Sequence, residues 1–95
     1  MSPAIEALRH QVEAPMRQHG VVHAAVFGSV ARGEARGGSD VDFLVEFEHG
    51  RSLLDLAGLR IELQEALGCE VDVATRDSLH PRLRDRILHE LVPLL

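Results

Sequence analysis

The chain contains no lysine, tryptophan or tyrosine, and phenylalanine is its only large aromatic residue, at three of 95 positions. So few bulky rings leave little material for a deep pocket that encloses a small organic molecule. All 10 basic residues are arginine, and 15 acidic residues outnumber them, which gives a formal net charge of −5. This balance argues against a broad nucleic-acid-binding surface and leaves room only for a local basic patch.

Cysteine and long apolar runs are equally scarce. The single cysteine, Cys69, cannot form an intrachain disulfide, and neither a secretion signal nor a membrane-length apolar segment is present. We therefore expect a cytoplasmic protein without a membrane contact, in which Cys69 is a small packed residue. The six histidines show no metal-binding pair at helical spacing, so none is assigned to a site.

Length and hydrophobic periodicity indicate one α/β domain over residues 1–95, with a single modest core and a sheet covered on one face. The predicted order is helix, strand, turn, strand, helix, strand and helix, over residues 2–15, 21–27, 28–39, 40–47, 52–68, 70–75 and 77–93. Pro15 is expected to kink or end the first helix. Asp77 or Ser78 is expected to cap the last one.

The end of the last predicted helix is rich in leucine. We expect Leu83 and Ile87 to pack under the sheet, because they follow helical spacing on one face. Leu94 and Leu95 lie beyond the periodic part and are candidates for docking on a partner protein.

The segment GSVARGEARGGSDVD, residues 28–42, carries the strongest chemical signal. Gly28 follows an apolar strand and lets the backbone turn sharply, while Ser29 opens a short helix whose free N–H groups and hydroxyl favour a bound anion. Asp40 and Asp42 alternate along the next strand and therefore project from the same face. The plainer interpretation is a tight turn with a helix cap, followed by two solvated carboxylates.

Two carboxylates on one strand face repel each other unless a cation lies between them. Such oxygen ligands suit Mg²⁺, or alternatively Mn²⁺, which bind through one or two carboxylates together with substrate phosphates. Asp72 supplies a third carboxylate, because Val71 and Val73 occupy the apolar face of another short strand. We predict that Asp72 joins Asp40 and Asp42, where it could hold a metal ion and accept the proton of an attacking hydroxyl.

Two arginines lie inside the signature segment. Arg32 has two open interpretations: a bidentate clamp on a triphosphate, or a structural ion pair with a nearby acid such as Asp72. Arg36 is expected to face solvent.

The chain resembles the minimal nucleotidyltransferases of the polymerase-beta-like superfamily, whose signature of Gly-Ser, ten residues and Asp-x-Asp is matched by Gly28, Ser29, Asp40 and Asp42. The Ala-Arg-Gly around Arg32 and the serine at Ser39 are similar to the family as well, and its third acidic position falls on Asp72. Residues 44–56 and 81–88 look like the antitoxin branch that is often encoded beside a HEPN ribonuclease toxin. The resemblance covers nearly the whole chain.

The resemblance implies a polymerase-beta-like α/β (α+β) fold, with a small mixed sheet and helices packed mainly on one face. It also implies a Mg²⁺-dependent protein adenylyltransferase that moves AMP from ATP to a hydroxyl, with pyrophosphate leaving. The implied nucleotide-binding residues are Gly28, Ser29, Arg32 and Ser39. The implied catalytic and metal-binding residues are Asp40, Asp42 and Asp72.

Relatives in the antitoxin branch modify a tyrosine of the toxin, and this chain has no tyrosine of its own. The resemblance therefore implies that the acceptor is supplied by a partner, a cognate HEPN toxin that the modification silences. Two alternatives remain open. One is a non-catalytic antitoxin that blocks the toxin by stoichiometric binding, and the other is adenylation of a small molecule such as an aminoglycoside.

Overall fold

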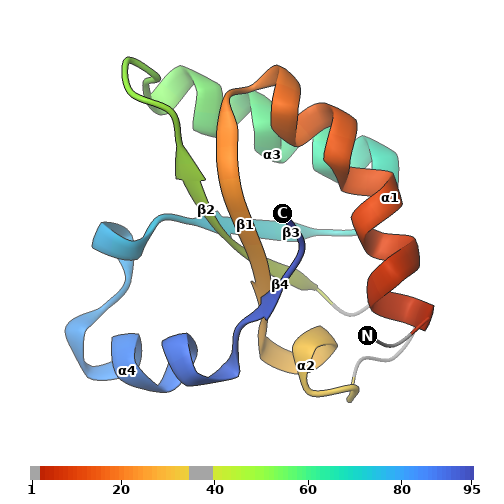
Figure 1. Cartoon of the computed structure of the whole chain (residues 1–95), viewed down its shortest axis with the longest axis vertical. Helices are drawn as coiled ribbons and strands as arrows, with labels where there is room; N and C mark the ends of the chain where they lie inside the picture. The colour runs from red at the N-terminus through yellow and green to blue at the C-terminus, as the bar shows by residue number, and fades with distance from the viewer. Residues whose placement is uncertain (1–2, 35–39) are drawn as a thin grey trace.

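A mixed four-stranded sheet organises the computed structural model, which describes residues 3–34 and 40–95 (Figure 1). The strands are β1 (Val21–Phe27), β2 (Val41–Phe47), β3 (Val71–Ala74) and β4 (Val92–Pro93), in the spatial order β3-β2-β1-β4. β1 runs antiparallel to both β2 and β4, whereas β2 and β3 are parallel. This topology confirms the predicted α/β fold with a small mixed sheet.

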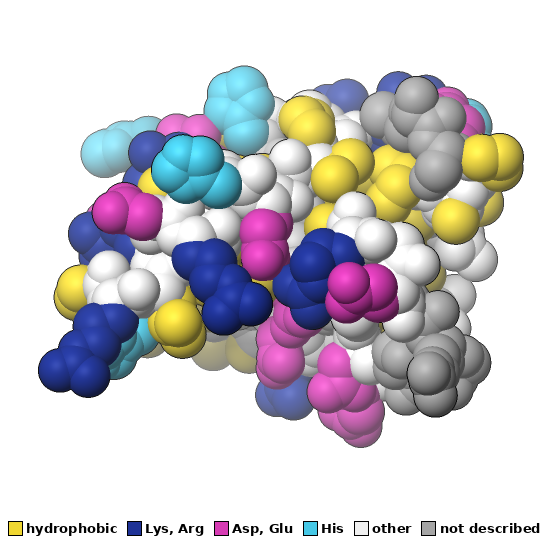
Figure 2. Space-filling view, turned by 90° about the horizontal axis from the view of Figure 1, so that it is seen from below, with side chains coloured by type: hydrophobic (Ala, Val, Ile, Leu, Met, Phe, Trp, Pro, Cys, Tyr) yellow, Lys and Arg dark blue, Asp and Glu magenta, His cyan; other side chains and the backbone are white. Residues whose placement is uncertain are grey.

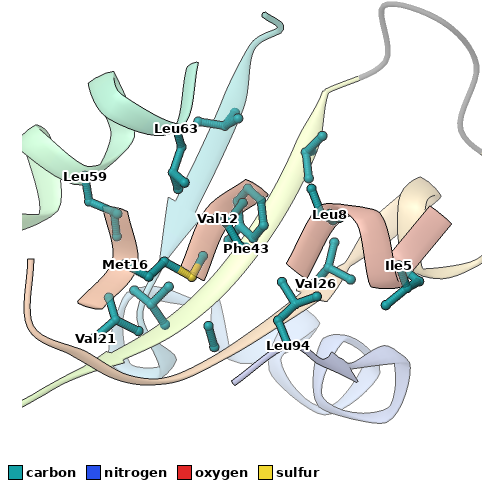
Figure 3. Close-up of a cluster of buried hydrophobic side chains, with 14 residues drawn as sticks. Ile5, Leu8, Val12, Met16, Val21, Val26, Phe43, Leu59, Leu63 and Leu94 are labelled. Atoms are coloured by element: carbon teal, nitrogen blue, oxygen red, sulfur yellow. The ribbon is translucent and has the colours of Figure 1, made fainter. Parts of the chain in front are cut away.

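Two long helices, α1 (Pro3–Gln18) and α3 (Leu53–Leu67), pack together over one face of this sheet (Figure 1). Figure 3 shows the contact from inside: Val12 and Met16 of α1 and Leu59 and Leu63 of α3 surround Phe43 of β2. All five side chains are fully buried. Burying each of them contributes roughly 1.5–3 kcal/mol, so this layer fixes which face of β2 turns inward.

The predicted strands β1 and β2 and the predicted helix α3 have the expected positions. The first helix does not end at Pro15. α1 continues to Gln18, and the N–H of His19 still donates to the carbonyl of Pro15 over 3.2 Å. Because Val12 and Met16 are buried on either side of the proline, core packing outweighs the helical hydrogen bond that proline cannot make.

The last helix begins later than predicted. A short 3₁₀ helix, η1 (Arg76–Ser78), comes first. In it the Ser78 hydroxyl accepts a hydrogen bond from the N–H of Thr75 at 3.0 Å. The helix α4 (Pro81–Glu90) then starts behind His80, whose Nδ1 accepts the N–H of Arg82 at 3.1 Å. A histidine therefore caps the helix, and the prediction of Asp77 or Ser78 as the cap was wrong.

The predicted roles of Leu83 and Leu94 are reversed, whereas Ile87 and Leu95 are both half-buried. The N–H of Leu94 donates to the carbonyl of Ala24 in β1 over 2.8 Å, and the Leu94 side chain is only 3% exposed. Leu83, expected under the sheet, is 49% exposed, and Ile87 is half-buried. Pairing of β4 with the edge of β1 carries the chain end into the core, so Leu94 is not available to a partner.

No helix among the described residues combines the length and the apolar character that crossing a membrane would need.

A capping box closes the start of α3. Asp55 accepts the N–H of Ser52 at 3.0 Å, and the Ser52 hydroxyl accepts the N–H of Leu54 at 3.2 Å. The hydrogen bond from Ser52 lowers the pKa of the Asp55 carboxyl, and the Arg51 guanidinium adds to the effect. Ionised Asp55 therefore stabilises the fold above its ordinary pKa of 3.8, and this stabilisation is lost as the pH falls through the lowered pKa.

We expect Asp55→Asn to lower the melting temperature by roughly a few degrees at about pH 7, and to lose this effect as the pH falls through the lowered pKa of Asp55. Thermal melts across that range test it, with Asp85→Asn at an exposed position of α4 as the matched control. A penalty of equal size at both ends of the range would contradict the assignment.

Candidate active site

Asp42 and Asp72 lie side by side on the sheet face opposite to α1 and α3. The parallel register pairs Asp42 of β2 with Asp72 of β3, while Val41, Phe43 and Val71 point into the core. Neighbouring strands are separated by about 4.8 Å, so the two side chains leave the same face close together. The structure thus brings together two of the three predicted carboxylates, and their catalytic roles stay predictions.

Asp40, the third predicted carboxylate, is exposed and immediately precedes β2. Strand alternation puts it on the same face as Asp42, about 7 Å along the chain. Its charge reaches Asp42 and contributes to the raised pKa of that residue. Within the part of the chain that the structure describes, however, no three acidic, histidine or cysteine side chains already converge as metal ligands.

The pKa of Asp42 reflects the crowding of negative charge at this site. Burial raises the pKa of the Asp42 carboxyl above its usual range, and the charges of Asp72 and Asp40 raise it further. Arg32 opposes the shift. A cation between these carboxylates would remove their repulsion, and a donor set made only of carboxylate oxygens suits a hard ion such as Mg²⁺ or Mn²⁺.

Gly28 brings the turn after β1 directly against Asp42. Its φ of +73° lies in the left-handed region, and a Cβ at this position would collide with Oδ2 of Asp42. Phe27, the preceding residue, is paired with Asp42 in the sheet. Only glycine combines this φ with the absence of a Cβ. It opens the short helix α2 (Gly28–Ala31), which contains Ser29 and contacts β2.

Arg32 follows α2 and forms ion pairs with two glutamates. Its Nε lies 3.0 Å from Glu34, and its Nη1 lies 3.2 Å from Glu90 at the end of α4. Of the two open interpretations, the structure shows the ion pair, with these partners instead of Asp72. A contact between Arg32 and a triphosphate stays a prediction. The charge of the guanidinium does act on Asp42, because it lowers the pKa of that carboxyl.

Sequence reasoning missed Glu90, because it lies 58 residues from Arg32 and no local spacing connects the two. Ser39 and Arg36, which the sequence placed at the nucleotide and in solvent respectively, lie outside the described residues.

A groove of about 760 Å³ continues along the sheet face that carries Asp42. Its lining comes from β1, β2, the η1 turn and the C-terminal segment, and includes His23, Leu44, Glu46, Arg76, Asp77 and Leu95. Arg76 and Asp77 had no predicted role at a site, because only the folded chain brings the η1 turn beside β2.

Figure 2 views the end of the molecule where α2 and α4 lie. Arginine and acidic side chains are interspersed there, and no continuous basic surface forms among the described residues on this face. The picture agrees with the excess of 15 acidic over 10 basic residues.

The family model described as "Nucleotidyltransferase domain" matches residues 8–94 of the chain. A protein of Methanocaldococcus jannaschii named "Putative protein adenylyltransferase" is 50% identical over 91 residues, which cover 96% of this chain and 98% of that protein. The protein adenylyltransferase MntA of Thermococcus cleftensis is 44% identical over 73 residues, which cover 77% of this chain and 74% of that one.

Solved structures agree with these relationships. One described as "putative minimal nucleotidyltransferase" superposes with a TM-score of 0.79 at 50% identity, covering 94% of both chains. A chain from a complex of tri-AMPylated Shewanella oneidensis HEPN toxin with MNT antitoxin superposes with a TM-score of 0.72. At 17% identity, covering 96% of this chain and 71% of that one, the second likeness shows the fold alone.

Proposed function

Since the chain belongs to the nucleotidyltransferase domain family, we propose that it transfers AMP from ATP to a hydroxyl group of a partner protein. The observation that carries the proposal is the in-register pair of Asp42 and Asp72 beside the Gly28 turn. The names of the relatives, protein adenylyltransferases, support a protein as the acceptor.

In the proposed reaction each predicted residue has a distinct task. Gly28 and Ser29 bind the β- and γ-phosphates of ATP through backbone N–H groups and the serine hydroxyl. Asp40 and Asp42 would hold Mg²⁺ or Mn²⁺, which when bound neutralises charge on the triphosphate. Asp72 accepts the proton of the acceptor hydroxyl as its oxygen attacks the α-phosphorus. The bond from the α-phosphorus to the bridging oxygen breaks, and pyrophosphate carries away the electron pair.

Arg32 is proposed as an additional phosphate ligand. Its two glutamate partners hold the guanidinium near Asp42 before the nucleotide binds, and a phosphate oxygen then competes with them. Guanidinium groups bind phosphate bidentately, so a phosphate can replace the carboxylates as the acceptor of the same N–H groups. Ser39 completes the proposed nucleotide-binding set on the strength of the family signature.

A HEPN toxin is the partner that we propose. Structures with the same fold come from complexes of MNT antitoxins with HEPN toxins, and one such toxin is AMPylated. The chain itself contains no tyrosine, so a tyrosine acceptor would have to come from another molecule. We place the reaction in the cytoplasm, where ATP is abundant and the free Cys69 stays reduced.

One observation favours a second candidate function. Solved structures with the same fold come from toxin-antitoxin complexes, so the chain could neutralise a toxin by binding alone. In that case the carboxylate site would be a relic, and neutralisation would require only a stable complex.

Labelled ATP distinguishes these functions. The purified chain is incubated with the HEPN partner, Mg²⁺ and ATP that carries ³²P at either the α or the γ position. AMP transfer puts α-label and no γ-label on the partner, since the bond to the β-phosphate is broken. Label from the γ position would contradict AMP transfer, and a stable complex that acquires no label would favour neutralisation by binding.

A further inference from the structure

We infer that the groove beside Asp42 holds an extended segment of the acceptor polypeptide, with basic residues flanking its hydroxyl-bearing side chain. The inference rests on the proposed function, because it assumes that a protein receives the AMP group. It adds where the acceptor lies and which sequence surroundings it favours.

The position of the groove connects it to the carboxylates. Leu44 lines the groove and follows Asp42 by two positions on the same face of β2, a step of about 7 Å. Thr75, also in the lining, follows Asp72 by three residues. A side chain that leaves a segment bound in the groove can therefore reach the carboxylates at its end.

The shape and chemistry of the groove suit a polypeptide. Ala25 and Leu44, each 8% exposed, form an apolar floor on adjacent strands where they are in register. Exposed His23 and Glu46 are also in register, and Arg76 and Asp77 add charge from the η1 turn. An apolar floor with charged rims can bury alternate side chains of a peptide and bind its polar groups.

A nucleoside fits the same groove less well. Nucleobases bind most readily by stacking on aromatic side chains, and Phe47, the one phenylalanine among the described lining residues, packs against the core cluster. Phe47 lies at the end of β2 that is farther from Asp42.

The charge of the lining favours basic flanking residues. Glu46 and Asp77 contribute two carboxylates against the one guanidinium of Arg76, and Asp42 and Asp72 add negative charge at the near end. Arginine or lysine beside the acceptor hydroxyl would complement this potential.

Charge reversal tests the inference on the intact chain. Glu46→Arg and Asp77→Arg change exposed side chains, so the fold should survive, and Glu65→Arg on α3 is the matched control. The affinity for the purified HEPN partner and, separately, for ATP with Mg²⁺ is measured by calorimetry. We expect each groove variant to weaken partner binding roughly tenfold and to leave ATP binding unchanged, with no change for the control.

Unchanged partner binding in both groove variants would overturn the inference. Weakened ATP binding with unchanged partner binding would overturn it as well, and would assign the groove to the nucleoside. A different result would contradict the proposed function, namely that the wild-type chain transfers no AMP to the partner. Weakened partner binding in the groove variants would still locate the bound segment in that case.

Discussion

Asp42→Asn should reduce AMP transfer about a thousandfold or more and leave the fold intact. The side chain is paired in register with Asp72 of the neighbouring strand, follows Asp40 by two positions, and lies against the Gly28 turn. An amide keeps the shape and removes the negative charge that would hold a metal ion, the cation that would in turn neutralise the triphosphate. The rate of AMP incorporation into the partner, measured by intact mass, is the direct readout.

The same variant has a second, independent signature in stability. Since burial and two neighbouring charges raise the pKa of Asp42, its ionised form costs the folded state stability above that pKa. Asp42→Asn should therefore melt no lower than the wild type in EDTA, and Mg²⁺ should stabilise only the wild type. Asp85→Asn serves as the control. Transfer within about tenfold of the wild-type rate would contradict a catalytic role for Asp42.

Gly28→Ala is expected to destabilise the protein by about 1–3 kcal/mol and to abolish transfer. The substitution combines a strained φ of +73° with a collision between the new Cβ and Oδ2 of Asp42. The Asp42 carboxylate must shift to admit the methyl group. Chemical denaturation measures the stability, and AMP incorporation measures the activity.

Gly33→Ala separates the two causes of that effect. Gly33 has the same φ of +73°, but a Cβ there would meet nothing within 4 Å. We expect it to cost only the backbone strain, about 1 kcal/mol, and to retain transfer. Equal loss of activity in both variants would show that the turn conformation matters and that contact with Asp42 does not.

The parts of the fold that sequence reasoning predicted are those with local signals. β1 and β2 have alternating or apolar runs that end in turn residues, and α3 has a serine cap at Ser52 and Gly68 in the left-handed conformation at its end. The face shared by Asp40, Asp42 and Asp72 follows from strand alternation alone. The register that puts Asp42 beside Asp72 does not, because pairing between strands is a long-range property.

The features that sequence reasoning missed all depend on contacts between distant segments. Leu94 enters the core because β4 pairs with β1 across about seventy residues, a closure that local periodicity cannot encode. The ion pair between Glu90 and Arg32 also depends on a long-range contact, because it forms only when α4 packs beside α2. Groove residues Arg76 and Asp77 look like ordinary turn residues until the η1 turn lies against β2.

The central claim is that the carboxylates beside the Gly28 turn transfer AMP to a partner protein. The most direct test is the intact mass of the HEPN partner after incubation with ATP, Mg²⁺ and either the wild-type chain or the Asp40→Ala, Asp42→Ala double variant. We predict that the wild type adds whole AMP units to the partner and that the double variant, folded and still bound to the partner, adds none. Equal AMP addition by both proteins, or no addition by the wild type in a stable complex, would contradict the claim.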